Sequence, residues 1–173
     1  FLNLSSFAEQ MLVHENALVK VRDDMPLDLA SLIGCSVVTG YGAVVHTAKV
    51  EPGSSVAIFG AGGIGLATIN AAQIAGAARI IAVDKDPFKL ELAKKFGATD
   101  VIDAASADNV VKRIQALSDG GVHYSFECIG LKATAEQSFS ALRSGGTATL
   151  IGMIPVGTKI ELHGPDFLRE RRI

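Results

Sequence analysis

The sequence has few of the residues that would mark a secreted or a nucleic-acid-binding protein. Only two cysteines, Cys35 and Cys128, occur among 173 residues, so no disulfide framework holds the fold, and free thiols suit a reducing cytosol. The formal net charge is −2, which gives no electrostatic reason to expect nucleic acid or an anionic membrane as a partner. Charged residues make up 20% of the chain and apolar residues 49%, which is a globular composition.

From the sequence we expect no targeting or membrane-anchoring segment. The opening residues, FLNLSSF, have neither an initiator Met nor a basic start, so they do not form a signal peptide. The longest apolar region, residues 56–83, is interrupted by glycines and polar side chains, which argues against a membrane span. We therefore expect a cytoplasmic protein. The sequence ends at Ile173, where a new apolar segment is expected to begin, so we also expect a piece of a longer polypeptide.

The most informative motif is GAGGIG at residues 60–65, which lies between an apolar run and a helix-like segment. Gly60, Gly62 and Gly65 fit the GxGxxG fingerprint of dinucleotide-binding proteins. Its glycines allow a tight turn, close approach of a pyrophosphate and close helix–strand packing, while N–H groups at the helix start attract phosphate. Asp84 ends the next apolar run, 19 residues after Gly65, where a carboxylate would accept hydrogen bonds from ribose hydroxyls. The pattern predicts a nucleotide site.

From residue 54 onward, apolar runs alternate with helical segments. We predict strands at 55–59, 79–83, 100–103, 122–127 and 147–151, and helices at 63–76, 87–96, 107–118 and 132–143. Strands that are buried on both faces read as continuous apolar runs. Alternating βαβ units with right-handed crossovers give an α/β fold with a doubly wound parallel sheet.

Residues 1–53 have a different pattern. Residues 7–13 and 17–21 look like two short antiparallel strands, followed by a helix from Pro26 to about Ile33 and a second helix at about 36–48. We expect residues 1–36 to be the tail of a neighbouring β-rich domain and residues 37–173 to form the nucleotide-binding domain.

Several strings together carry a resemblance to one family. They are LIGCSVVTGYGAVVHTAKVEPGSSVAIFGAGGIGLA, IIAVDKDPFKLELAKKFGATDVID and GGVHYSFECIG, which follow one another in this order. The chain resembles the coenzyme-binding portion of zinc-dependent medium-chain alcohol dehydrogenases, including the glutathione-dependent formaldehyde dehydrogenase branch. The resemblance implies a Rossmann domain, NAD as coenzyme and a catalytic zinc held by two cysteines and one histidine. It makes Cys35 one of these ligands, with the other two upstream of this chain.

The resemblance also assigns contacts to individual residues. Thr39 and Ile64 would pack against the nicotinamide, and Asp84 would favour NAD because a carboxylate repels a 2′-phosphate. Phe1 and Leu2 match apolar residues beside the zinc. Further coenzyme contacts implied in this way are Gly60, Gly62, Gly63, Gly65, Lys89, Cys128, Ile129, Gly130, Ile151, Gly152 and Met153.

The residue types alone leave structural alternatives open. By residue type alone, Cys35 would be a buried core residue without a functional role. Thr39 would be a hydroxyl at a helix N-terminus, and Lys89 a solvent-exposed lysine on a helix. Cys128 is expected to be an unligated core thiol. The four histidines are not spaced as metal ligands; they are His14, His46, His123 and His163. No Ser-His-Asp arrangement, EF-hand or Walker lysine is visible either.

We expect the intact protein to transfer hydride between a small alcohol or aldehyde and NAD, and this chain alone to be inactive. Alternatives are a zinc-free quinone or enoyl reductase of the same superfamily, a non-catalytic NAD-sensing domain and an adenosylmethionine-dependent methyltransferase. Residues 158–162 would contribute to an edge at which two copies pair, so a homodimer or higher oligomer is expected.

Overall fold

The computed structural model describes residues 7–173, which belong to two units, Phe1–Leu32 and Ile33–Ile173. The described part of the first unit contains a short 3-10 helix, η1 (Glu15–Ala17), and helix α1 (Leu27–Leu32). The second unit holds every strand of the described chain. Phe1 and Leu2, predicted to lie beside a zinc, fall outside the described residues.

The two strands predicted at 7–13 and 17–21 are wrong. Over these residues, all of which the structure describes, the chain forms a bend at 7–9, irregular backbone and the last residue of the helix η1. The ring of His14 caps this helix, because its Nδ1 accepts a hydrogen bond from the N–H of Asn16 at 3.2 Å. An alternating apolar pattern makes a strand only where a second strand supplies hydrogen-bond partners, and none does so here.

The helical region between Pro26 and Lys49 is continuous, whereas two separate helices were predicted. Instead of two helices, one helical stretch runs over Leu27–Ala48. After α1 it comprises π-helix η2 (Ile33–Val37), α2 (Val38–Gly42) and π-helix η3 (Ala43–Ala48), and it ends at Lys49 with a left-handed φ of 53°. Its length and composition alone would suit a membrane span, but a core helix of a soluble protein meets the same criteria.

Five parallel strands form one sheet in the second unit, in the order β3-β2-β1-β4-β5. Neighbours in sequence are separated by helices, so each connection is a crossover, and the predicted doubly wound α/β fold is confirmed. The strands are β1 (Ser55–Phe59), β2 (Arg79–Asp84), β3 (Asp100–Asp103), β4 (Val122–Glu127) and β5 (Leu142–Leu150).

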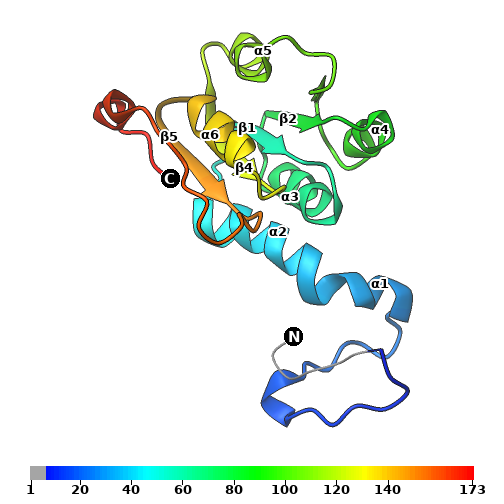
Figure 1. The fold of residues 1–173 in the computed structure, drawn as a ribbon. Helices are drawn as coiled ribbons and strands as arrows, with labels where there is room; N and C mark the ends of the chain where they lie inside the picture. Colours follow the sequence, from blue (N-terminus) through cyan, green and yellow to red (C-terminus); the bar gives the residue numbers. More distant parts are fainter. Residues whose placement is uncertain (1–6) are drawn as a thin grey trace. The chain divides into compact units, whose positions relative to one another are not determined.

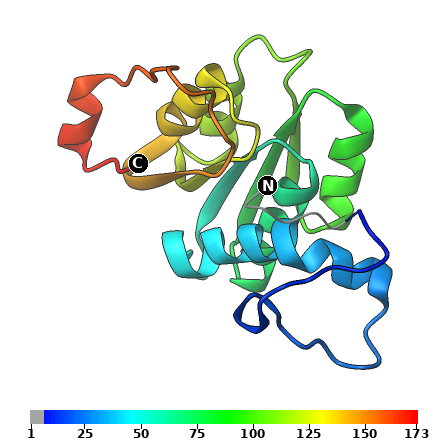
Figure 2. The same ribbon diagram turned by 60° about the horizontal axis from the view of Figure 1, so that its bottom comes forward.

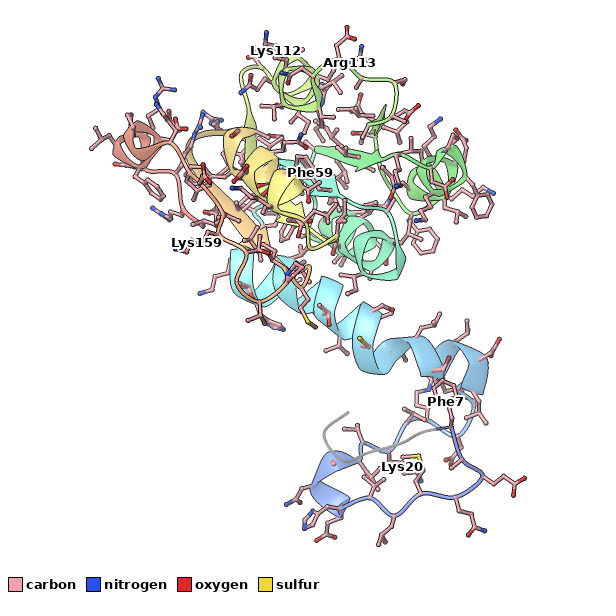
Figure 3. All side chains as sticks on the ribbon, viewed as in Figure 1. Phe7, Lys20, Phe59, Lys112, Arg113 and Lys159 are labelled. Atoms are coloured by element: carbon pink, nitrogen blue, oxygen red, sulfur yellow. The ribbon has the colours of Figure 1, made fainter. Side chains whose placement is uncertain are left out.

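Helices cover both faces of this sheet (Figures 1 and 2). Ile58 of β1 packs in a cluster with Ile69 of α3, whereas Phe59 points to the opposite face and packs with Ile114 and Phe139 (Figure 3). Successive residues of a strand point to opposite faces, so a fully apolar strand is buried on both sides. The helices are α3 (Gly63–Ile74), α4 (Pro87–Lys95), α5 (Val110–Leu117) and α6 (Lys132–Ser140).

The helix boundaries follow local capping chemistry. Asp86 caps α4 by accepting a hydrogen bond from the N–H of Phe88 at 3.0 Å, with Pro87 in the first turn. Asn109 caps α5 by accepting from the N–H of Lys112 at 2.9 Å. Side-chain acceptors at these positions satisfy N–H groups that the helix itself leaves unpaired. The α5 cap explains why this helix starts three residues later than predicted.

The last part of the chain runs beside β5. The strand predicted at 147–151 begins earlier, at Leu142, and Thr147 forms an isolated parallel bridge with Arg172. A short 3-10 helix, η4 (Gly164–Arg169), precedes this bridge. Residues 158–162 form no strand in the structure, so pairing of two copies through this segment stays a prediction.

Two glycines bring helices into close contact in the second unit. A Cβ atom on Gly65 of α3 would overlap the carbonyl oxygen of Gly60, and one on Gly40 of α2 would lie 2.7 Å from the amide nitrogen of Thr68. Only glycine permits these approaches. Gly65 therefore fixes how closely α3 follows the end of β1.

We expect Gly65→Ala to lower the free energy of unfolding by about 2 kcal/mol or more, because the new methyl group meets backbone that cannot move aside. Gly63→Ala is the matched control. Its Cβ would lie 3.6 Å from that of Ser36, an ordinary contact, so its stability should stay within about 1 kcal/mol of the parent. Chemical denaturation measures both, and equal stability of the two variants would contradict this packing.

Candidate functional site

A crevice of about 360 Å³ opens at the carboxyl ends of β1, β2 and β4. The crossover from β1 leads to β2 on one side, and β4 pairs with β1 on the other, so the crevice lies where the strand order reverses. Ligands of doubly wound sheets bind at this kind of position. We call it the carboxyl-end crevice; it is lined by Phe59, Gly60, Gly62, Val83, Asp84, Lys85, Lys89, Ala104, Cys128, Ile129, Leu131, Thr134 and Gln137.

The glycine turn forms one wall of this crevice. Gly60 has a φ of 95°, in the left-handed region, and its N–H donates to the carbonyl of Val83 at 2.8 Å. Gly62 caps α3, and a Cβ there would meet open space. The first N–H groups of α3 lie within the opening turn of the helix, where they have no partner in the helix. This combination of open space and free donors is suited to a diphosphate.

Asp84 lies at the end of β2 and is only 9% exposed. One carboxylate oxygen accepts a hydrogen bond from the N–H of Ala61 at 2.8 Å, and the other accepts from the N–H of Asp86 at 3.0 Å. The carboxylate thus ties the glycine turn to the end of the neighbouring strand. Each oxygen keeps a further lone pair that a ligand hydroxyl can use.

Glu127, at the end of β4, was not singled out by the sequence analysis. Its side chain is fully buried, and its oxygens accept hydrogen bonds from the N–H groups of Ile129 and Gly130 and from the hydroxyl of Thr134 at 2.7–3.0 Å. A buried carboxylate needs such partners. Glu127 therefore shapes the loop that forms the other wall of the crevice. A carboxylate at the end of an apolar strand is the signal that would have revealed it.

Cys128 lines the crevice next to Glu127, and its buried thiol favours the protonated form. Burial is the main cause that raises its pKa to about 12, against a hydrogen bond with Thr68 that lowers it. The sulfur lies 3.9 Å from the hydroxyl oxygen of Thr68. A thiol that stays protonated is a poor nucleophile and a poor metal ligand.

The segment after β5 approaches the same loop through its backbone. The N–H groups of Ile151 and Gly152 donate to the carbonyl of Glu127 at 2.8 and 2.9 Å. Gly152 packs so tightly on Gly130 that a side chain at either position would collide with backbone. Met153 is 89% exposed and does not line the crevice.

Cys35 and Thr39 lie on the helical stretch that adjoins the start of α3. Cys35 is exposed in η2, so the expectation of a buried filler is not met, and Thr39 is half-buried in α2. Within residues 7–173, no three His, Cys, Asp or Glu side chains gather closely enough to hold a metal ion. Cys35 by itself therefore does not fit a zinc ion.

The structure brings together only part of the predicted set. Six predicted residues line the carboxyl-end crevice: Gly60, Gly62, Asp84, Lys89, Cys128 and Ile129. Gly63, Ile64 and Gly65 belong to the first turns of α3 behind it. The coenzyme contacts of all these residues, and of Thr39, Ile151 and Met153, stay predictions.

Comparisons with known proteins point in one direction. Residues 63–173 match the family described as zinc-binding dehydrogenase. The chain is 43% identical over 176 residues to alcohol dehydrogenase-like 5 of Arabidopsis thaliana, covering 100% of this chain and 45% of that protein. It is 43% identical over 162 residues to alcohol dehydrogenase class-3 of Pisum sativum, covering 92% of this chain and 43% of that protein. The chain thus spans less than half the length of these relatives.

Solved structures give the same result. An alcohol dehydrogenase zinc-binding domain protein from Burkholderia ambifaria superposes with a TM-score of 0.86 at 42% identity, over 90% of this chain and 42% of that one. Benzyl alcohol dehydrogenase from Acinetobacter calcoaceticus superposes with a TM-score of 0.86 at 38% identity, over 90% and 43% of the two chains.

The two cysteines should differ sharply in reactivity. We expect iodoacetamide at pH 8 to label Cys35 in the folded, metal-free protein and to leave Cys128 unlabelled until the chain unfolds. Raising the pKa of Cys128 from 9.0 to about 12 lowers its thiolate fraction about a thousandfold. Mass spectrometry of peptides measures both sites, with Cys35→Ser as the control that removes the fast reaction. Equal labelling of both thiols in the folded protein would contradict this description.

Proposed function

The chain belongs to the zinc-dependent medium-chain dehydrogenase family, of which it carries the coenzyme-binding portion, and from that premise we propose that its carboxyl-end crevice binds NAD. The family resemblance drawn from the sequence strings is confirmed by the matched family and by its relatives. The observation that carries the proposal is the glycine turn. It presents an unobstructed position at Gly62 next to the start of α3, on the same crevice as the carboxylate of Asp84.

The residues present fit this coenzyme. Amide N–H groups in the first turn of α3 would hold the diphosphate, because a helix start offers unpaired donors and the positive end of the helix dipole. Asp84 would accept hydrogen bonds from the hydroxyls of the adenosine ribose. Its carboxylate is held in place by Ala61 and Asp86, so it needs no rearrangement to bind a diol. Lys89 lines the crevice on the same side.

The charge at Asp84 supports NAD over NADP. A 2′-phosphate on the ribose would lie next to this carboxylate, and the two negative charges would repel each other. Lys85 and Lys89 also line the crevice, so the carboxylate does not act alone. We place Asp84 as the residue that decides between the two coenzymes.

The whole protein would transfer hydride between a small alcohol or aldehyde and the nicotinamide. A relative is named benzyl alcohol dehydrogenase and others are named alcohol dehydrogenases, which supports this substrate class. Zinc, when bound, would supply a Lewis acid that lowers the pKa of an alcohol. Cys35 would be one zinc ligand in the whole protein. Residues 7–173 do not contain a complete set of metal ligands, so we derive no catalytic step through zinc. Thr39 and Ile64 would line the nicotinamide side.

We also propose a domain boundary, a cellular location and an oligomeric state. Residues 1–36 would be the tail of the catalytic domain and residues 37–173 the Rossmann domain. The structural units, Phe1–Leu32 and Ile33–Ile173, divide the chain within a few residues of that point. A cytoplasmic homodimer or higher oligomer remains our expectation.

We expect Gly62→Ala to raise the dissociation constant of NADH at least about tenfold, because the methyl group would occupy the open position at the turn. Its thermal midpoint should stay close to that of the parent protein, since the Cβ meets no other atom. NADH fluorescence titration measures the affinity.

Gly164→Ala is the matched control, because its Cβ also meets open space but lies on η4, outside the crevice. It should bind NADH like the parent protein. The proposal fails if the parent binds no NADH, or if Gly62→Ala binds it as tightly as Gly164→Ala does.

A further inference from the structure

A second and larger cavity lies at the opposite end of the same sheet. It has a volume of about 680 Å³ and is formed where β1, β2, β4 and β5 begin. We call it the arginine pocket. It is lined by Gly53, Ser54, Ser55, Ala78, Arg79, Leu117, Ser118, Asp119, Gly120, His123, Arg143, Ser144, Arg169 and Arg171. Its volume is within the range of roughly 300–1,000 Å³ that small-molecule sites occupy.

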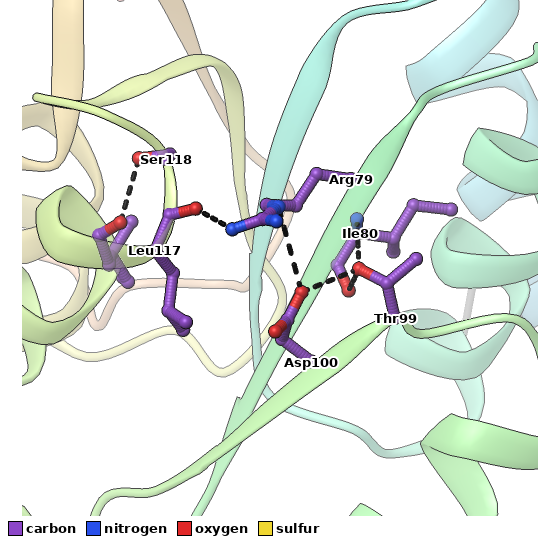
Figure 4. Close-up of polar contacts among 7 residues, drawn as sticks. Arg79, Ile80, Thr99, Asp100, Leu117 and Ser118 are labelled. Atoms are coloured by element: carbon purple, nitrogen blue, oxygen red, sulfur yellow. Dashed lines mark hydrogen bonds and ion pairs between the residues drawn. The ribbon is translucent and has the colours of Figure 1, made fainter.

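The lining of the arginine pocket is strongly basic. Four guanidinium groups face a single lining carboxylate, that of Asp119. One of the four, Arg79, is committed to the fold: its Nη1 donates to the carbonyl of Leu117 and its Nε lies 3.8 Å from a carboxylate oxygen of Asp100 (Figure 4). Arg79 thereby ties the end of α5 to β2 and β3. The other three are Arg143, Arg169 and Arg171, and their N–H groups are the charged donors that a ligand could use.

Two of these three share one acid. Arg171 and Arg169 lie 3.1 and 4.0 Å from the same carboxylate oxygen of Asp166, so one negative charge faces two positive ones. Arg143 has no carboxylate partner in the described chain. Its Nη1 instead contacts Nε2 of His123 at 2.8 Å. The local surplus of positive charge is therefore centred on Arg143, Arg169 and Arg171.

His123 does not add to this charge. Burial and the nearby Arg143 lower the pKa of its imidazole, against a smaller opposite effect of Glu51. A neutral ring leaves the guanidinium charge of Arg143 uncancelled, and its Nδ1 accepts a hydrogen bond from the N–H of Ser55 at 3.1 Å. His123 therefore lies beside Arg143 without adding to or opposing its charge, and no carboxylate of the described chain pairs with Arg143.

Two buried donors in the lining have no hydrogen-bond partner among the described residues. The hydroxyl of Ser54 belongs to a residue that is 6% exposed, and Nε belongs to the side chain of Arg171, which is 9% exposed. Buried polar groups are nearly always paired, so each indicates a missing acceptor. A water molecule would satisfy one donor, but it would not account for the four arginines that line the same pocket.

We propose that the arginine pocket binds a small molecule through an oxyanion, either a phosphate or a carboxylate group. Arginine presents paired N–H groups that match the two oxygens of either group. Arg143 and Arg171 would supply the charged donors, and the hydroxyl of Ser54 would complete the site. This site is separate from the carboxyl-end crevice and does not depend on the proposed coenzyme.

Calorimetric titration of the purified full-length protein with inorganic phosphate and with malonate, in a chloride buffer of low ionic strength, tests the proposal. We expect at least one of the two to bind saturably, with a dissociation constant below about 1 mM. Whichever binds more tightly identifies the anionic group. Arg143→Gln should weaken this binding about tenfold, since it removes a charged donor.

Ser54→Ala is the second variant, chosen because it loses no hydrogen bond within the described chain and should fold normally. It should weaken binding several-fold at an unchanged thermal midpoint. Arg113→Gln is the matched charge control, because Arg113 lies on α5 outside the pocket (Figure 3). Its affinity should stay within about twofold of the parent.

Three outcomes would overturn the proposal. The first is no saturable binding of either anion up to about 10 mM. The second is an equal loss of affinity in Arg113→Gln and Arg143→Gln, which would show that only net charge matters. The third is a loss of affinity in Gly62→Ala that matches that of Arg143→Gln, which would place the anion in the carboxyl-end crevice. The NADH titration is a separate measurement, so this proposal and that of the coenzyme can fail independently.

Discussion

The close approach of α3 to the end of β1 is the constraint on which the rest of the site depends. Gly65 lies against the carbonyl of Gly60, and only a residue without a side chain fits there. This contact aims the first turn of α3 at the crevice and leaves its N–H groups open. The neighbouring strands are joined to the same point, because Gly60 donates to Val83 and Cys128 donates to Phe59.

Buried charge is used in the same way at two places on the crevice. Asp84 and Glu127 stand at the ends of β2 and β4, where the flanking sequence is apolar, and each accepts hydrogen bonds from backbone N–H groups of the following loop or the glycine turn. A buried carboxylate is unfavourable unless it is paired. Here the hydrogen bonds to the two carboxylates fix the conformation of the loops, so both walls of the crevice are formed without a ligand.

Much of the fold follows from local sequence, and the failures have a physical origin. The apolar runs at β1, β2 and β4 predict strands because a parallel sheet buries both faces of each strand. The strands predicted at 7–13 and 17–21 are wrong, because an alternating pattern does not supply the partner strand. The helix over Leu27–Ala48 continues through Gly34, since the helical ladder is carried on by π turns that no residue pattern announces.

Only part of the candidate site can be predicted from the local sequence. The glycine turn and Asp84 were predicted from the GxGxxG spacing, and the structure places Gly60, Gly62 and Asp84 on the same crevice. The position of Glu127 at the end of β4 is visible in the sequence, but its hydrogen-bond partners are not, because they depend on which loop folds back over the strand end. The arginine pocket was not predictable either, since its lining comes from segments as far apart in sequence as Ser54 and Arg171. The parallel strands bring Ser54, Arg79 and Arg143 together, and the bridge between Thr147 and Arg172 brings Arg171 to the same end of the sheet.

The central claim is that the carboxyl-end crevice holds NAD, with Asp84 against the adenosine ribose. The most direct measurement is calorimetric titration of the same protein with NADH and with NADPH under identical conditions. The account predicts saturable binding of NADH and at least about tenfold weaker binding of NADPH. Absence of binding by both coenzymes, or equal affinity for the two, would contradict it.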